Sequence, residues 1–596
     1  MADSTGTNRS PLKAWVRALE ITGPIEHNPS VTLPLVVQKL ADQFGPKLAL
    51  ADDDDQMTYR ELAEQSNRYA RWAVGQGINA GDIVCLLMRN CPRYFAIWLG
   101  ITQIGGIVSL LNTNLTGSSL AYAINIVAPK HIIVGSELAE TIADVLPQLN
   151  SSAEIWVRGE SAYGFAQIDQ VIEQETGTSI AGLEFRPPAI NDHALYIYTS
   201  GTTGLPKAAK VSHFRLMQWS YWFAGLMDTG PSDRMLNCLP MYHSVGGIVA
   251  IGSVLVTGGS VVIRQKFSSS HFWDEVAEWD CTLFQYIGEL CRYLVNAPQH
   301  PRETEHRLRL CCGNGLRADV WPEFQRRFRI PQILEFYAST EGNVSLYNCE
   351  GKAGAIGRVP SFLAHRSNLA LVKYDFETEA PVRNEEGFCV ASLPAEVGEA
   401  IGKIGDDASQ TSRFEGYADV EASDKKVLRN VFASGDAWFR TGDLMRRDNQ
   451  GYYYFVDRVG DTFRWKGENV ATAEVATKIS AYPDILEAII YGVPIPGTEG
   501  RAGMVTVVAG ERFELDAFHK YLRENLPDYA RPLFLRLCDT IETTATFKSK
   551  AHELKQEGYN PAVIADAVFF NDRIRQAFVK LDAALYESIQ AGRIFL

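Results

Sequence analysis

A strand-like run at residues 194–198 leads into the stretch Tyr198-Thr199-Ser200-Gly201-Thr202-Thr203-Gly204-Leu205-Pro206-Lys207. Four serine or threonine hydroxyls, two glycines and a lysine lie within these ten residues. Glycines let backbone amides point inward, hydroxyls donate to oxygen atoms and lysine adds positive charge, so this loop suits a polyphosphate. It is not a Walker A loop, because the pattern fails and Pro206 removes an amide donor. The alternative interpretation is a flexible linker of the same composition, which would not require these residues to stand in any particular order.

Helix-like and strand-like segments alternate through the first third of the chain. A capping box at Thr58-Tyr59-Arg60-Glu61 opens one helix, a strand-like run follows at 83–88, and Pro92 opens the next helix. The same alternation runs through residues 236–340. This pattern predicts parallel sheets that are covered by helices.

The pattern changes near residue 355, where short β-like runs replace the helical periodicity up to residue 457. Asp448-Asn449-Gln450-Gly451 separates two such runs and predicts a hairpin. A smaller α+β unit follows residue 461, and an apolar extension covers 560–596. We therefore predict a domain boundary at 458–461. The smaller unit should contain helices at 471–481 and 515–526, and strands near 487–494, 504–509 and 533–538.

Composition and charge exclude several classes of protein. The 596 residues include 57 basic and 71 acidic side chains, a net charge of −14 that argues against a broad nucleic-acid surface. The ten cysteines form no C-x-x-C pair, and no Cys/His cluster or H-E-x-x-H motif suggests zinc. We expect buried thiols in a reducing compartment.

The sequence shows neither a secretory signal nor an apolar stretch long enough to span a membrane. Leu12, Trp15, Val16 and Leu19 could share one helical face that touches a membrane surface. Docking of this helix on its own domain is the favoured interpretation.

A second loop, Gly313-Asn314-Gly315-Leu316-Arg317-Ala318, follows a strand-like run and precedes a helix. It matches the dinucleotide fingerprint G-x-G-x-x-G/A, and Glu335 lies about 20 residues further on, where such folds place a ribose-binding carboxylate. An NAD(P) oxidoreductase is therefore a competing hypothesis. It leaves the loop at 198–207 unexplained.

Two further loops carry a carboxylate. In Tyr337-Ala338-Ser339-Thr340-Glu341-Gly342 the carboxylate stands beside hydroxyls and could hold Mg²⁺ next to phosphates, although a turn or N-cap is the commoner use of these residues. In Trp438-Phe439-Arg440-Thr441-Gly442-Asp443 the aspartate could accept both hydroxyls of a ribose, or could simply belong to a turn.

These four loops, in this order and spacing, resemble the acyl-adenylate-forming superfamily of acyl-CoA synthetases, peptide-synthetase adenylation domains and luciferases. The resemblance covers residues 30 to 560, approximately. Finer features resemble one branch, the fatty acid transport protein or very-long-chain acyl-CoA synthetase family. These features are the segment 285–293, Gly313-Asn314-Gly315-Leu316-Arg317 with Asp319-Val320-Trp321, the segment 457–470, and Thr546-Phe547-Lys548.

The resemblance implies a fold and a reaction. The fold is α/β: a large N-terminal domain (1–457) of two α/β subdomains plus a β-rich subdomain, a hinge at 458–461, and a small mobile α+β C-terminal domain with its extension (462–596). The reaction is that of an AMP-forming fatty acid:CoA ligase for long or very long chains. A carboxylate attacks MgATP to give acyl-AMP and pyrophosphate, and the CoA thiolate then attacks acyl-AMP.

The resemblance also implies roles for individual residues. Glu341 would bind Mg²⁺, Thr340 would meet the α-phosphate, Lys548 would be the catalytic lysine and His243 would line the carboxylate end of the acyl site. Gly467 would line the CoA tunnel. The implied ATP- and AMP-binding residues are Thr199, Ser200, Gly201, Thr202, Thr203, Gly204, Lys207, Gly313, Asn314, Gly315, Tyr337, Ser339, Thr340, Asp443, Arg458 and Lys548.

Three positions depart from the family pattern. Gly460, with Asp461 next, stands where relatives carry the hinge Asp or Lys; Phe547 replaces a glycine before Lys548, with Lys550 two residues on; and Ala338 replaces a glycine. The hinge residue and the choice between Lys548 and Lys550 therefore stay open.

The expected partners are a fatty acid, ATP and CoA, with no nucleic acid. We expect a cytoplasmic protein with at most peripheral association at the inner face of a membrane. Two alternatives remain: a fatty acid uptake protein with coupled acylation, and a CoA ligase for another bulky carboxylate such as a sterol-derived acid. Chain length and oligomeric state do not follow from the sequence.

Overall fold

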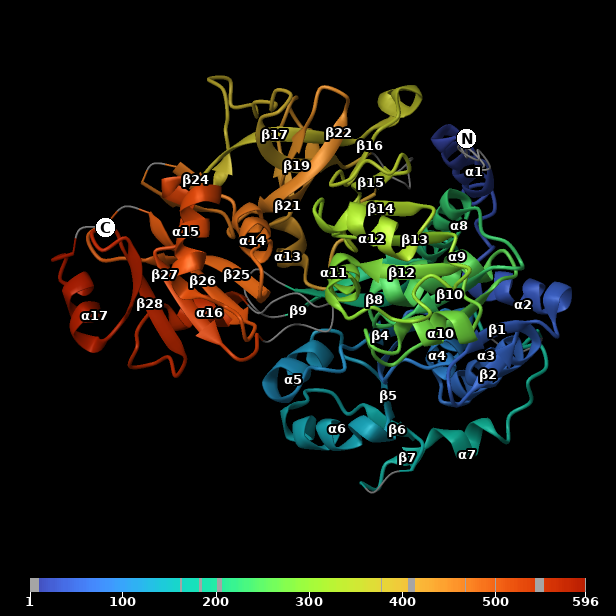
Figure 1. Ribbon diagram of the computed structural model, residues 1–596. Coiled ribbons are helices and arrows are strands. Elements are labelled where there is room, and N and C mark those ends of the chain that lie inside the picture. Colours follow the sequence, from blue (N-terminus) through green and yellow to red (C-terminus); the bar gives the residue numbers. More distant parts are fainter. Residues whose placement is uncertain are drawn as a thin grey trace. The chain divides into compact units, whose positions relative to one another are not determined.

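The computed structural model describes residues 10–160, 163–181, 185–200, 206–376, 378–405, 413–466, 468–498, 500–541 and 551–594 (Figure 1). Contacts divide the chain into two compact units. The first contains residues 1–361 and 404–427, and the second contains residues 362–403 and 428–596. The predicted hinge at 458–461 thus lies within the second unit and stays a prediction.

One sheet of the first unit contains seven strands in the order β7-β6-β5-β3-β4-β8-β9. Its neighbouring strands run parallel, except for the antiparallel pair β8 and β9. The strands are β3 (Ile83–Leu87), β4 (Ile107–Leu110), β5 (His131–Gly135), β6 (Glu154–Arg158), β7 (Ala166–Gln167), β8 (His193–Ser200) and β9 (Pro206–Ser212). Associated helices are α3 (Tyr59–Gly75), α4 (Pro92–Gln103), α5 (Gly117–Asn125), α6 (Ala139–Val145) and α7 (Ile168–Ile172).

A second sheet of this unit follows the order β16-β15-β14-β13-β12-β10-β11-β1-β2, and its central strands β11 to β14 are parallel. The strands are β1 (Leu48–Ala51), β2 (Gln56–Thr58), β10 (Arg234–Asn237), β11 (Ser260–Ile263), β12 (Leu283–Ile287), β13 (Leu310–Asn314), β14 (Ile333–Ala338), β15 (Ser345–Asn348) and β16 (Gly357–Arg358). The helices are α1 (Pro11–Thr22), α2 (Leu33–Phe44), α8 (His213–Met227), α9 (Ala250–Leu255), α10 (Phe272–Glu278), α11 (Gly288–Asn296), α12 (Val320–Phe328) and α13 (Val420–Asp424). The predicted α/β alternation is confirmed.

Local sequence signals set several of these boundaries as predicted. The Thr58 hydroxyl accepts a hydrogen bond from the Glu61 amide at 3.3 Å, and the Glu61 carboxylate accepts one from the Thr58 amide at 2.8 Å, which completes the capping box of α3. Pro92 occupies the first turn of α4, where its missing amide costs no helical hydrogen bond.

Helix α1 packs on its own unit, as the favoured interpretation held. The indole of Trp15 meets Trp222 and Tyr347 edge to face, at ring distances of 5.8 and 5.6 Å. Leu12, Trp15, Val16 and Leu19 follow the spacing of one helical face, as expected, but their burial differs: Trp15 is buried whereas Leu12 is 53% exposed. The buried stripe instead follows the helical spacing of Ala14, Trp15, Ala18 and Thr22. Among the described residues no helix is long and apolar enough to cross a membrane.

The second unit begins with an antiparallel sheet in the order β18-β17-β19-β21-β22, with β20 paired to β21. Its strands are β17 (Leu369–Asp375), β18 (Ala380–Pro381), β19 (Val397–Lys403), β20 (Val427–Arg429), β21 (Ala437–Arg447) and β22 (Tyr452–Arg458). The predicted hairpin joins β21 to β22, and Asp448 closes its turn by accepting the amides of Gln450 and Tyr452.

The C-terminal part contains the hairpin β23 (Phe463–Trp465) and β24 (Glu468–Val470), and a sheet in the order β25-β26-β27-β28-β29. The sheet is formed by β25 (Ile485–Pro494), β26 (Arg501–Ala509), β27 (Phe534–Cys538), β28 (Ala567–Asp572) and β29 (Ala577–Lys580); the helices are α14 (Thr472–Ser480), α15 (Leu515–Asn525), α16 (Ala551–Glu557) and α17 (Ala583–Gln590). The predicted α+β unit is confirmed. Its apolar extension supplies β28, β29 and α17, and buries Val568, Phe570 and Phe578.

Candidate active site

The loop rich in hydroxyl groups joins the ends of β8 and β9. These antiparallel strands place Thr199 opposite Lys207 and Ser200 opposite Pro206, so the first and last members of the motif are neighbours across the pair. Gly201, Thr202, Thr203 and Gly204 lie outside the described residues, as do Gly467, Lys548 and Lys550, and the Ser200 side chain is likewise not described.

The predicted metal ligand, Glu341, follows β14 and is only 8% exposed. Its Oε1 accepts a hydrogen bond from the hydroxyl of Tyr417 at 2.8 Å. The neighbouring Thr340 hydroxyl lies 3.1 Å from the hydroxyl of Ser244. The buried Ser339 hydroxyl has no hydrogen-bond partner within the described part of the chain. This loop therefore holds one carboxylate that is already oriented and one hydroxyl whose hydrogen bonds are unmet.

Arg215, on α8, fixes the backbone of the same loop. Its Nη1 donates to the Thr340 carbonyl at 2.6 Å and its Nη2 to the Arg413 carbonyl at 3.1 Å, while its Nε lies 3.3 Å from Glu415 Oε1. The Ser212 amide and hydroxyl also donate to the Glu415 carboxylate, at 2.8 and 2.6 Å. No sequence motif had singled out Arg215, Glu415 or Tyr417, because their partners lie far away in the chain.

The loop at Gly313–Gly315 is held by a buried carboxyl on the next strand. Glu335 Oε1 accepts hydrogen bonds from the amides of Gly315 and Leu316, the second at 3.1 Å, and Oε2 accepts one from the Tyr286 hydroxyl. Burial raises the pKa of Glu335 to about 8. The fingerprint interpretation, in which Glu335 binds a ribose, is therefore wrong. Both oxygens of this carboxyl make hydrogen bonds within the protein, to Tyr286 and to the loop at Gly315 and Leu316.

Two glycines of this loop are required by close approach and by backbone conformation. A Cβ on Gly313 would lie 2.2 Å from the Tyr286 carbonyl oxygen, and Gly315 adopts a φ of +81°. Between them, the buried Asn314 Oδ1 has no hydrogen-bond partner within the described residues. The loop thus holds an amide oxygen whose hydrogen bonds are unmet, between two glycines that no larger residue could replace without strain.

His243 lies in the segment that joins β10 to α9. Its ring is 4.7 Å from the ring of Tyr242, and its carbonyl accepts a hydrogen bond from the Gly247 amide at 2.7 Å. A π-helical turn, Val245–Val249, follows it, a conformation that is frequent at functional sites. Since Ser244 touches Thr340, the neighbour of His243 in sequence contacts the Ser-Thr-Glu loop.

The predicted ribose-binding pair belongs to the second unit. Asp443 and Arg458 stand opposite each other on β21 and β22, with Nε and Oδ1 3.7 Å apart. The Asp443 amide donates to the Thr441 hydroxyl at 3.0 Å, and this hydroxyl donates to the Ala400 carbonyl at 2.7 Å. The backbone of Asp443 is thus supported from its own strand and, through Thr441, from β19.

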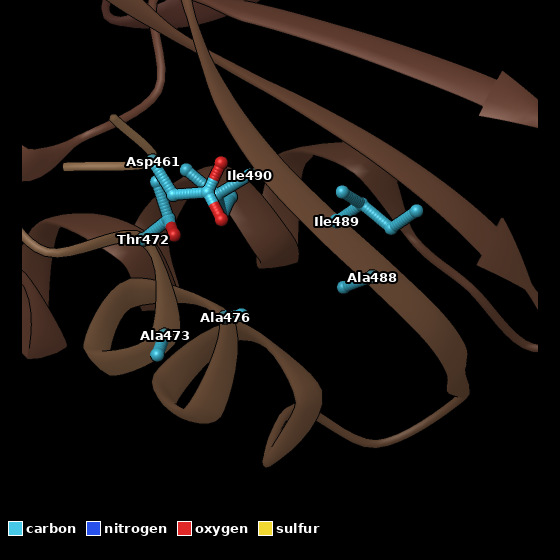
Figure 2. Close-up of a pocket in the computed structure, with 7 residues that line it drawn as sticks. All are labelled: Asp461, Thr472, Ala473, Ala476, Ala488, Ile489 and Ile490. Atoms are coloured by element: carbon cyan, nitrogen blue, oxygen red, sulfur yellow. The ribbon is translucent and has the colours of Figure 1, made fainter. Parts of the chain in front are cut away.

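Hydrogen bonds surround the predicted hinge segment. The buried Asp457 carboxylate accepts the Thr472 amide at 2.6 Å and the Thr462 hydroxyl at 2.9 Å, and Asp461 pairs with Lys555 at 2.8 Å. Figure 2 shows Asp461 and Thr472 at one end of a hollow of about 210 Å³, between Ala473 and Ala476 of α14 and the β25 residues Ala488, Ile489 and Ile490. Ligand pockets are usually larger, roughly 300–1,000 Å³.

Sequence comparison adds two observations to this geometry. The family model described as "AMP-binding enzyme" matches residues 37–391, and the model "AMP-binding enzyme C-terminal domain" matches residues 474–548. Long-chain fatty acid transport protein 1 of Mus musculus is 39% identical over 570 residues, which cover 94% of this chain and 88% of that protein. The chain belongs to the AMP-binding enzymes, in the long-chain fatty acid transport protein family.

Solved structures confirm the fold of this AMP-binding enzyme. The anthranilate CoA ligase AuaEII in complex with anthranoyl-AMP matches with a TM-score of 0.75 and 20% identity, covering 88% of this chain and 97% of that one. ATP-bound MatB from Rhodopseudomonas palustris matches with a TM-score of 0.72 and 23% identity, covering 88% and 99%. At these identities the likeness establishes the α/β architecture with its separate C-terminal sheet.

The residues of this family member fit a nucleotide. Asn314 Oδ1 and the Ser339 hydroxyl are buried polar atoms without hydrogen-bond partners in the described chain, and such atoms are rare unless a ligand or water completes them. The predicted binding residues are divided between the units: the residues at 199–207, 243, 313–315 and 337–341 belong to the first, and Asp443 and Arg458 to the second.

Proposed function

We propose that this AMP-binding enzyme is an ATP-dependent fatty acyl-CoA synthetase for long- or very-long-chain acids. The observation that carries the proposal is the meeting, within one unit, of the ends of the hydroxyl-rich loop and the Glu341 carboxylate, both in contact with Tyr417. The named relatives are long-chain fatty acid transport proteins, and a solved structural neighbour holds ATP. Both support ATP and a long-chain acid as substrates.

In the first half-reaction, the carboxylate of the fatty acid attacks the α-phosphate of ATP and pyrophosphate leaves. The proposed role of Thr340 is to donate to the α-phosphate, and that of residues 199–207 is to hold the other phosphates. Asn314 and Tyr337 would flank the adenine, and Asp443 and Arg458 the ribose. Glu341 would hold Mg²⁺, which when bound neutralises phosphate charge.

In the second half-reaction, the CoA thiolate attacks the acyl carbonyl of acyl-AMP and AMP leaves. Lys548 would serve the first step, where an amine that contacts both anionic groups lowers their repulsion most strongly in the transition state. Gly467 would line the pantetheine path of the second step. For Gly467 to replace Lys548 at the site between the two steps, the C-terminal domain, 462–596, would have to rotate about 458–461.

A pyrophosphate-release screen tests the substrate class. Free acids of graded chain length, together with one sterol-derived and one aromatic acid, are supplied with MgATP and CoA. We expect release to be greatest with long-chain acids and to be accompanied by acyl-CoA. Release only with the sterol-derived or aromatic acid would contradict the proposed substrate.

The two half-reactions can be assayed separately in three variants. Lys548→Ala should lose acyl-AMP formation by about 10²–10³ yet still convert supplied acyl-AMP and CoA, and Gly467→Leu should do the reverse. If Lys550→Ala alone shows the adenylation defect, Lys548 is the wrong lysine. If no variant separates the steps, the rotation mechanism is wrong for this protein.

The names of the relatives favour a second candidate function, fatty acid uptake with coupled acylation. An enzyme that converts incoming acid to its CoA ester would drive uptake without forming a pore. Uptake of labelled acid by cells that express Glu341→Gln separates the two functions. Uptake that falls together with ligase activity supports metabolic trapping, whereas uptake that persists supports a carrier.

A further inference from the structure

The segment around Tyr417 is attached to the strand that begins with the lysine of the phosphate loop. The Lys210 amide donates to the Gly416 carbonyl at 3.0 Å, and the Ala418 amide donates to the Ala208 carbonyl at 2.8 Å. Tyr417 itself forms an antiparallel bridge with Ala209. The Tyr417 backbone is therefore fixed to β9, although more than 200 residues separate the two segments.

The Tyr417 side chain contacts three predicted site residues at once. It is buried, its hydroxyl lies 2.8 Å from Glu341 Oε1, and the Thr199 side chain hydrogen-bonds to the same hydroxyl. The Lys207 ammonium lies 5.6 Å from the centre of its ring. One aromatic side chain thus touches the end of β8, the start of β9 and the predicted metal ligand.

The direction of the hydrogen bond follows from the two functional groups. The phenol hydroxyl of Tyr417 carries a donor, whereas an ionised carboxylate can only accept. The hydroxyl must therefore donate to the carboxylate, and a donor of this kind fixes the orientation of a metal-binding carboxylate.

A second set of contacts fixes the opposite side of this arrangement. Arg215 donates to the carbonyls of Thr340 and Arg413 and pairs with Glu415, two residues before Tyr417. Because the arginine and the glutamate are both buried, removal of either partner would leave an uncompensated charge. The loop that ends at Glu341 and the segment that leads to Tyr417 are consequently held by the same side chain.

We propose that Tyr417 is a positioning residue that orients the Glu341 carboxylate relative to the loop at 199–207. The metal ligand and the phosphate loop are thereby aligned before the nucleotide binds, which removes part of the ordering cost of binding. This inference rests on the proposed function, because it concerns the binding of a magnesium–nucleotide complex.

Tyr417→Phe removes the hydroxyl and keeps the ring. The matched control is Tyr59→Phe, because Tyr59 is equally buried and its hydroxyl also makes two hydrogen bonds, to the carbonyls of Leu255 and Gly259. ATP binding to each full-length protein is measured by calorimetry, once with Mg²⁺ and once with EDTA. Hydrogen bonds to charged groups are worth about tenfold or more in binding. We therefore expect Tyr417→Phe to bind ATP about tenfold more weakly with Mg²⁺ but within twofold of wild type with EDTA.

The control should stay within twofold of wild type under both conditions. A double-mutant cycle with Glu341→Gln then tests whether Tyr417 acts through the carboxylate, since residues that act as a unit have non-additive effects. We expect Tyr417→Phe to cause no further loss of Mg²⁺-dependent binding in the Glu341→Gln background.

Two results would overturn the inference alone: equal behaviour of Tyr417→Phe and Tyr59→Phe with Mg²⁺, or additive effects in the cycle. Failure of the wild-type protein to bind ATP at all would overturn the proposed function and the inference together. If Tyr417→Phe does not fold, Arg215→Lys must show the Mg²⁺-dependent loss, because it keeps the charge but replaces the guanidinium fork that holds the same segment by a single ammonium group.

Discussion

Glu341 and Asp443, the two carboxylates assigned to the nucleotide, stand in contrasting surroundings. Glu341 is 8% exposed and accepts a 2.8 Å hydrogen bond from Tyr417. Asp443 lies 3.7 Å from the guanidinium of Arg458, whose side chain is 46% exposed. A short hydrogen bond between buried groups fixes a geometry in advance, whereas a long contact to an exposed side chain allows it to adjust.

The difference leads us to expect different roles for the two regions. Around Glu341, the Tyr417 hydroxyl donates to the carboxylate, and Arg215 pairs with Glu415. Around Asp443, the strands position the residue, and its arginine partner is half-exposed. We expect the Glu341 region to act on Mg²⁺-dependent binding and on the chemical step, and the Asp443 region to act mainly on nucleotide affinity.

The largest effect should come from Glu341→Gln. The amide oxygen can still accept the Tyr417 hydrogen bond, so the fold should stay intact while the metal loses its anionic ligand. We expect pyrophosphate release to fall by about 10²–10³, the usual cost of removing one preorganised charge-stabilising group. Wild-type kinetics in this variant would exclude Glu341 as the metal ligand, and thermal unfolding of the same sample controls for misfolding.

The next largest effect should be a dependence of stability on pH, which arises from Glu335. Its folded-state pKa of about 8 exceeds the ordinary value of 4.5, so between these values the folded chain binds more protons than the unfolded chain. This group's contribution to stability is complete below pH 4.5 and is lost as the pH rises through 8. One pKa unit corresponds to about 1.4 kcal/mol, so the contribution should fall by roughly 3 kcal/mol between pH 5.5 and 7.5.

Glu335→Gln isolates that contribution, because glutamine imitates the protonated acid and keeps acceptors for the Gly315 and Leu316 amides. Urea unfolding at pH 5.5 and 7.5 should show the variant gaining stability relative to wild type at the higher pH. The wild-type curve alone is insufficient, since burial lowers the pKa of His213 to about 4 and so makes stability fall below pH 6.5. A difference between variant and wild type that does not change with pH would contradict a protonated Glu335.

Asp443→Asn should have a smaller effect and a different kinetic signature. An asparagine keeps one acceptor oxygen but loses the charge and the second acceptor, and because the arginine partner is half-exposed, water replaces part of the interaction. We expect the KM for ATP to rise about tenfold with kcat within about threefold of wild type. A fall in kcat of a hundredfold at unchanged KM would mean that this region is as preorganised as the Glu341 region, and the contrast would fail.

Lys555→Ala should have the smallest effect. The pair with Asp461 is 2.8 Å long but partly exposed, at 22% and 44% for the two side chains, and such pairs contribute about 1 kcal/mol or less. We expect a slight destabilisation that disappears in 1 M NaCl, measured by chemical unfolding. Lys520→Ala, which removes an exposed helical pair with Glu524, is the matched control. A loss well above that of the control would show that the hinge segment depends on this ion pair.

The sequence predicted structural features correctly where residues close together in the chain cause them. The capping box at Thr58, the helix start at Pro92 and the hairpin at Asp448 each depend on residues within four positions, and all three were predictable. Three motif loops were equally readable, because each comes at the end of a strand, whereas the segment 438–443 was predicted as a loop and instead lies within β21. The same reasoning could not reach contacts between distant segments.

Glu335 and Tyr417 illustrate the limit in physical terms. The spacing of Glu335 after Gly315 fits a ribose carboxylate, but the register of β13 and β14 turns it toward the Gly315 amide instead. Tyr417 reaches Glu341, 76 residues away, only because its backbone pairs with β9. Neither arrangement leaves a periodic signal, since it depends on which strands become neighbours.

The hairpin formed by β28 and β29 has a consequence for solubility. A β-strand at the edge of a sheet exposes unpaired amides and carbonyls, to which the strand of another molecule can add. Without residues 567–580, the buried strand β27 would become such an edge, with Phe534 and Leu535 beside it. With the hairpin in place, the edge is β29, four residues long and ending in Lys580. Short, charged edges resist intermolecular pairing, so we expect this C-terminal segment to limit aggregation through this edge of the sheet.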